Sequence, residues 1–87
     1  MARASRVLAR VLSGTADQNL RFEQLKGLLL SLGFDLRVRG SHHIFSRSDV
    51  EEIINLQPRE GGLAKPYQVR QVRELIVKYR LSEKERA

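Results

Sequence analysis

Residues 34–47 read FDLRVRGSHHIFSR, and this stretch decides the fold. From Phe34 to Arg39 apolar and polar side chains alternate strictly, which is the pattern of a half-buried β-strand. We expect Phe34, Leu36 and Val38 to point inward and Asp35, Arg37 and Arg39 to point outward. Gly40 and Ser41 interrupt the alternation, and residues 41–47 can return as a second strand. Because the link between the two is so short, the stretch predicts an antiparallel hairpin.

A third strand and two helices surround this hairpin in the sequence. Residues 51–57, EEIINLQ, supply β-branched side chains for the third strand. The stretch 22–32 has leucines at helical spacing and stops at Gly33, a residue suited to closing a helix in the left-handed conformation. Residues 59–64 are expected to form a loop. Pro66 then begins the last helix, because proline is favoured at the first helical position.

The first and last helices are expected to be amphipathic. Residues 2–13 form a short helix that turns Arg3, Arg6 and Arg10 away from its apolar side, although residues 1–16 also have the composition of an organellar transit peptide. The expected buried stripe of the last helix consists of Val69, Val72, Ile76 and Tyr79. On its polar side we expect a solvent-exposed ion-pair ladder of Arg70, Glu74 and Lys78.

These elements define an α+β domain. For this order of elements, the compact solution is a three-stranded antiparallel sheet with helices on one face and the other face open. The α-β-β-β-α core has the layout of a double-stranded-RNA-binding domain, here with an extra N-terminal helix. The expected divisions are an N-terminal helix and connector (residues 1–19), the α-β-β-β-α domain (residues 20–81) and a charged tail that frays (residues 82–87).

Composition and net charge limit the classes of function open to the chain. The chain has 87 residues, enough for one domain, and 16 lysines and arginines against 10 acidic residues give a net charge of +6. This balance is typical of proteins that bind a polyanion, first of all nucleic acid. The absence of cysteine excludes thiolate metal sites, disulfides and cysteine nucleophiles, and two histidines cannot build a structural zinc centre. We expect a cytoplasmic protein with no metal, no cofactor and no membrane span.

The candidate chemistry lies in two adjacent histidines, His42 and His43. Consecutive strand residues point to opposite faces, so one ring should face the open side of the sheet and the other the helices or the sheet edge. Histidine titrates at about pH 6.5 and can take the proton of an RNA 2′-hydroxyl, which lets that oxygen attack the adjacent phosphorus. The cations available to hold the phosphate are Arg37, Arg39, Arg47 and Lys65. A structural pair, with one ring half-buried and one solvated, is the alternative interpretation.

The segment LGFDLRVRGSHHIF (residues 32–45) resembles the HicA family of type II toxin–antitoxin systems, together with the leucine-rich helix before it and the helix KPYQVRQVRELIVKY after it. The resemblance covers about residues 22–81, and its specific part is the string GSHHIF. It implies an mRNA interferase, which is a metal-independent endoribonuclease that arrests translation and is inhibited by a HicB-type antitoxin. The family's catalytic histidine maps onto His42, with His43 as the second candidate. Gly40 would provide the tight turn, and Ser41 would orient the ring or hydrogen-bond a phosphate.

Two further interpretations stay open. A non-catalytic RNA-binding module would grip structured RNA through shape and phosphate contacts, with steep salt dependence and the RNA left intact. Alternatively, the basic surface would serve mainly to dock an acidic antitoxin. The expected partners are therefore mRNA and a HicB-type antitoxin. The sequence sets neither the oligomeric state nor the face that the N-terminal helix covers.

Overall fold

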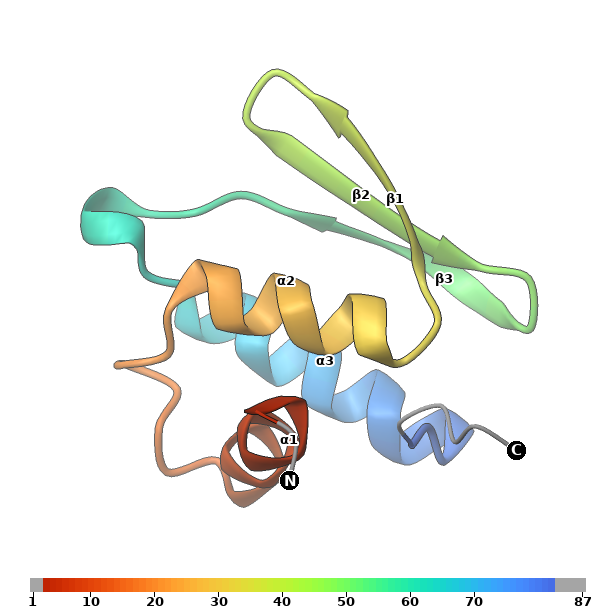
Figure 1. Ribbon diagram of the computed structural model, residues 1–87, viewed down its shortest axis with the longest axis horizontal. Coiled ribbons are helices and arrows are strands. Elements are labelled where there is room, and N and C mark those ends of the chain that lie inside the picture. Colours follow the sequence, from red (N-terminus) through yellow and green to blue (C-terminus); the bar gives the residue numbers. More distant parts are fainter. Residues whose placement is uncertain (1–2, 83–87) are drawn as a thin grey trace.

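The computed structural model describes residues 3–82 and shows an α+β fold with three helices and a three-stranded sheet (Figure 1). In chain order the elements are α1 (Arg3–Ser13), α2 (Phe22–Ser31), β1 (Asp35–Arg39), β2 (His42–Arg47), β3 (Val50–Leu56), the 3-10 turn η1 (Glu60–Gly62) and α3 (Pro66–Tyr79). Each expected helix and strand is present, with ends close to the predicted ones, and η1 lies in the expected loop. Of the charged tail expected at residues 82–87, only Ser82 lies among the described residues.

The sheet is a meander in the order β1-β2-β3, and both neighbouring pairs are antiparallel. Arg39 lies opposite His42, so Gly40 and Ser41 alone make the turn between β1 and β2. Gly40 has a φ of 60°, whereas the φ of Ser41 is not positive. This is the pattern of a type II′ hairpin turn, which favours glycine at its first central position. The tight turn predicted at Gly40 is therefore confirmed.

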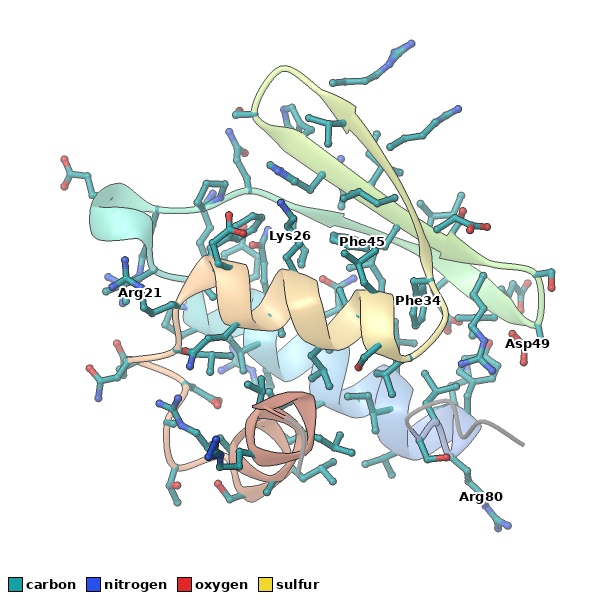
Figure 2. All side chains as sticks on the ribbon, in the orientation of Figure 1. Arg21, Lys26, Phe34, Phe45, Asp49 and Arg80 are labelled. Carbon is teal, nitrogen blue, oxygen red and sulfur yellow. The ribbon has the colours of Figure 1, made fainter. Side chains whose placement is uncertain are left out.

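The helices form two further layers. α2 and α3 lie against one face of the sheet, and α1 packs on these helices on the side away from the sheet (Figure 1). Phe45 on β2 and Phe34 before β1 lie between the sheet and α2 (Figure 2). The core cluster also contains Val7, Val11, Leu20, Phe22, Leu25, Leu28, Leu29, Leu32, Val50, Ile54, Leu56, Ala64, Val69, Val72, Leu75, Ile76 and Leu81. Within the described chain, none of the helices has the length and apolar character that a membrane span requires.

One side chain of the predicted inward row is not buried. Val38 is 55% exposed, whereas Phe34 is buried and Leu36 is half-buried against the core. The register places Val38 opposite His43, on the side that the helices cover, so its predicted direction is right. Its predicted burial is wrong, because β1 is an edge strand and the tip of the β1–β2 hairpin projects beyond the helix layer (Figure 1).

The N-terminal helix is tied to α3 through an arginine. Arg73 donates hydrogen bonds to both carboxylate oxygens of Asp17, at 3.0 and 3.1 Å, and to the backbone carbonyl of Val11, at 3.0 Å. Both side chains of this ion pair are largely buried, so the pair fastens the connector after α1 onto α3. α1 therefore covers α2 and α3 and leaves the outer face of the sheet open.

The polar contacts of α3 differ from the predicted ladder. Lys78 pairs with Glu52 of β3, with 2.7 Å between Nζ and Oε2, and not with Glu74 one turn earlier. Tyr79, which the sequence predicts in the buried stripe, is half-buried. Its hydroxyl donates to Glu52 Oε1 at 2.6 Å and accepts from the backbone N–H of Glu51 at 3.2 Å. Leu75, which the predicted stripe lacks, is buried instead. Within residues 3–82 Arg70 and Glu74 form no ion pair either, so the predicted ladder is absent, and Lys78 pairs with a carboxylate of β3 instead.

The Glu52 contacts predict an acid-sensitive contribution to stability. The hydrogen bond from Lys78 and then that from Tyr79 lower the pKa of Glu52 from 4.5 to about 2. Since the folded pKa lies below the unfolded one, this contribution is complete above pH 4.5 and is lost as the pH falls from 4.5 to about 2. In urea unfolding at several pH values, Glu52→Gln should therefore lose less stability over this range than the wild type. The control is Glu60→Gln, which removes an exposed carboxylate on η1 and should lose stability with acid as the wild type does. An acid profile of Glu52→Gln identical to that of the wild type would contradict the prediction.

Candidate active site

The open face of the sheet has a positive end. By the strand register, the side chains that point away from the helices are Asp35, Arg37 and Arg39 on β1, His42, Ile44 and Ser46 on β2, and Glu51, Ile53 and Asn55 on β3. The two arginines and His42 gather toward the β1–β2 turn, whereas Asp35 and Glu51 lie toward the opposite end. An anion that approaches this face is therefore attracted to the end at the turn.

His42 is exposed on this open face. Its Nδ1 lies 3.1 Å from Oδ1 of Asn55, the residue that stands opposite Ile44 on β3. The ring is thus oriented by a side chain of the neighbouring strand. As predicted from the alternation, one of the two histidines faces the open side.

The two arginines of β1 flank this ring. Arg39 lies directly opposite His42, and Arg37 lies opposite Ile44, two pairs further along the ladder and therefore on the same face. Directly opposed Cβ atoms are about 5 Å apart and diagonal ones about 7 Å, so both guanidinium groups can reach a phosphate beside the ring. Both arginines are exposed, and neither has an ion-pair partner within residues 3–82. They are available to bind an anion.

His43 points to the other face. Its ring packs edge-on against Phe22 of α2, with 4.8 Å between ring centroids and an interplanar angle of 70°. Its Nδ1 donates to the backbone carbonyl of Ser41 at 3.3 Å. The half-buried ring therefore joins the hairpin to the start of α2, which is a packing role.

Two glutamines join the β1–β2 turn to the end of β3, and the end of β3 to α3. Gln57 donates from Nε2 to Oγ of Ser41 at 2.9 Å. Gln68 of α3 is only 5% exposed; it accepts from the backbone N–H of Gln57 and donates to the carbonyl of Asn55, both at 3.3 Å. The Ser41 hydroxyl thus bonds Gln57 and not the His42 ring, but it only accepts in this contact and can still donate to a phosphate oxygen.

The other two predicted cations do not share the open face. Arg47 lies at the opposite end of β2, about 16 Å along the strand from His42. Its guanidinium donates to the carbonyl of Leu32 at 2.7 Å and pairs with Asp49 at 2.8 Å, so it joins the end of α2 to the β2–β3 turn. Lys65 directly precedes α3, on the side of the sheet that the helices cover. The structure therefore brings Arg37 and Arg39 to His42, and not Arg47 or Lys65.

Two residues of the site were missed from the sequence, Asn55 and Gln57. Both alternate with the fully buried Ile54 and Leu56, and this period of two is a sequence signal that the two amides share one face. The signal does not say which partner they meet. Asn55 reaches His42 only because β3 pairs with β2 in the observed register.

No three histidine or acidic side chains within residues 3–82 group closely enough to hold a metal ion. No family model, curated protein or solved structure matches the chain. The site itself offers an exposed imidazole with an oriented ring, two guanidinium groups and a hydroxyl at a tight turn.

Proposed function

We propose that this protein is a metal-independent endoribonuclease of the HicA type, an mRNA interferase whose domain has the double-stranded-RNA-binding layout. The observation that carries the proposal is the exposed His42 beside Arg39 and Arg37 on the open face of the sheet. RNA cleavage by its own 2′-hydroxyl needs a base and groups that offset charge on the phosphate, and these side chains supply both. His42 is the general base of this reaction. The protein would act in the cytoplasm of a prokaryote.

In this mechanism RNA lies across the positive end of the open face, with a phosphate against Arg37 and Arg39. A ring nitrogen of His42 accepts the proton of the 2′-hydroxyl. The 2′-oxygen then bonds to the adjacent phosphorus, the bond from phosphorus to the 5′-oxygen breaks, and water protonates that leaving oxygen. One product ends in a 2′,3′-cyclic phosphate and the other begins with a 5′-hydroxyl. The guanidinium groups offset the charge that grows on the phosphate oxygens.

The same face suits a protein inhibitor. The chain carries a net charge of +6, and Arg37 and Arg39 are exposed next to the half-buried Ile44. An acidic antitoxin of the HicB type that covers this face would pair with the arginines and exclude RNA from His42. Its binding and RNA cleavage should therefore compete.

The test is cleavage of a long mRNA by the purified protein in the presence of EDTA. We expect cutting, with new 5′ ends that polynucleotide kinase labels directly because they are hydroxyls. New ends that carry a 5′-phosphate, or cutting that EDTA abolishes, would contradict the mechanism. RNA that stays whole but is retarded in a gel would show a non-catalytic RNA-binding module instead.

A further inference from the structure

We infer that Asn55 is the positioning residue of this site: its side-chain oxygen holds His42 in the tautomer with the proton on Nδ1, which leaves Nε2 to accept the proton of the RNA. The catalytic part of the inference rests on the proposed function. The tautomer itself is a property of the free protein and can be measured without RNA.

The assignment of the proton follows from the atoms in contact. The 3.1 Å between His42 Nδ1 and Asn55 Oδ1 is a normal length for an N–H···O hydrogen bond. A carboxamide oxygen only accepts hydrogen bonds, so Nδ1 has to be the donor. A neutral imidazole carries one ring proton, and its other nitrogen is then the base. The oxygen of Asn55 therefore selects Nε2 as the atom that reacts.

The position of Asn55 is set by a rigid part of the fold. Its neighbours Ile54 and Leu56 are 0% exposed, so the strand is anchored in the core on both sides of Asn55. The carbonyl of Asn55 also accepts a hydrogen bond from the buried Gln68. A group that orients a base works best when its own backbone is held in this way.

An amide suits this position better than a carboxylate. An acidic residue behind the ring would orient it as well, as in the serine hydrolase triad. A carboxylate would, however, bring a second negative charge close to the phosphate that Arg37 and Arg39 bind. Asn55 orients the ring and adds no charge.

The side chain of Asn55 contributes little to the stability of the fold. It is exposed, and its one side-chain hydrogen bond within residues 3–82 is that to His42. Replacing it should therefore leave the midpoint of urea unfolding almost unchanged, as is usual for surface substitutions. A loss of function in such a variant would not come from unfolding.

His43 provides an internal reference. Its Nδ1 also donates to an oxygen, the backbone carbonyl of Ser41, so it should have the same tautomer as His42. That contact does not involve Asn55. A change in the side chain of Asn55 should therefore alter the tautomer of His42 and leave that of His43 as it is.

The first test is long-range ¹H–¹⁵N NMR of the imidazole rings at a pH where both are neutral. The wild type should show the proton on Nδ1 for both histidines. In Asn55→Leu, which keeps the size and removes the acceptor, His42 should shift toward the Nε2–H form that water favours, with His43 unchanged. Asn55→Asp keeps an oxygen acceptor and should keep the wild-type tautomer. The inference is overturned if His42 carries its proton on Nε2 in the wild type, or if Asn55→Leu leaves its tautomer unchanged.

The second test is the rate of RNA cleavage. Asn55→Leu should lower kcat roughly ten- to hundredfold with KM unchanged, because it removes orientation of the base and no contact to RNA. Asn55→Asp should recover part of kcat, and Ile53→Ala, on the same face of the same strand, should match the wild type. A tautomer shift with unchanged kcat would overturn the catalytic part of the inference. If the wild type does not cut RNA, the proposed function fails, and the NMR result still decides whether Asn55 sets the tautomer.

Discussion

Replacing His42 with alanine is expected to lower the rate of RNA cleavage by at least about a hundredfold, the lower end of what a general base contributes. The variant should stay folded, because His42 is exposed and its side chain makes one hydrogen bond, to Asn55. The measurement is cleavage of a long mRNA in EDTA by wild type and variant purified in parallel. Circular dichroism of the same samples checks the fold. Equal cleavage by the two proteins would trace the activity to a contaminating ribonuclease or to another residue.

The matched control is His43→Ala, one position along the same strand. His43 packs against Phe22, so its loss should cost about 1 kcal/mol of stability, the usual value of an aromatic pair. Cleavage should be retained at a temperature where the variant is folded. A folded His43→Ala variant without activity, beside an active His42→Ala, would reverse the assignment of the base.

Phe45→Ala should cost about 3–5 kcal/mol of unfolding free energy, the usual range for a phenylalanine removed from a core. Phe45 is 0% exposed and lies opposite Leu36 on β1 and Ile54 on β3, at the centre of the layer between the sheet and α2 (Figure 2). Domains of this size are stable by about 5–15 kcal/mol, so the loss is a large fraction of the total. Urea unfolding followed by circular dichroism measures it.

Val38→Ala is the comparison for this effect. Val38 is also an apolar strand residue that points to the same side of the sheet as Phe45, but it is 55% exposed. It should cost less than about 1 kcal/mol, because little apolar surface is removed from a buried position. A cost for Val38→Ala as large as that for Phe45→Ala would mean that the helices cover the hairpin tip after all.

The elements of the fold were predictable because their signals are local. The strict alternation from Phe34 to Arg39, the turn at Gly40 and the proline at the start of α3 each restrict a short piece of backbone directly. Burial at the ends of elements was less predictable. Val38 and Tyr79 follow the apolar pattern, yet their exposure depends on how far the opposing layer extends.

The candidate site was likewise only partly predictable from the sequence. The sequence identifies His42 and His43 and places them on opposite faces, because strand periodicity alone requires it. It does not distinguish Arg39, directly opposite His42, from Arg47, whose guanidinium is bound to Leu32 and Asp49. Both residues are arginines, and one of the contacts that hold Arg47, with the carbonyl of Leu32, joins residues 15 positions apart.

The sequence by itself determined the order of helices and strands, the hairpin turn, the basic charge and the residue types of the site. These follow from backbone preferences and from side-chain periodicity within short segments. Only the tertiary structure decided that α1 packs on α2 and α3 on the side away from the sheet, that Lys78 pairs with Glu52, and that Asn55 hydrogen-bonds His42. Each of these contacts joins segments that are distant along the chain. Their geometry is set by strand register and layer packing, which depend on the whole core and not on any one stretch.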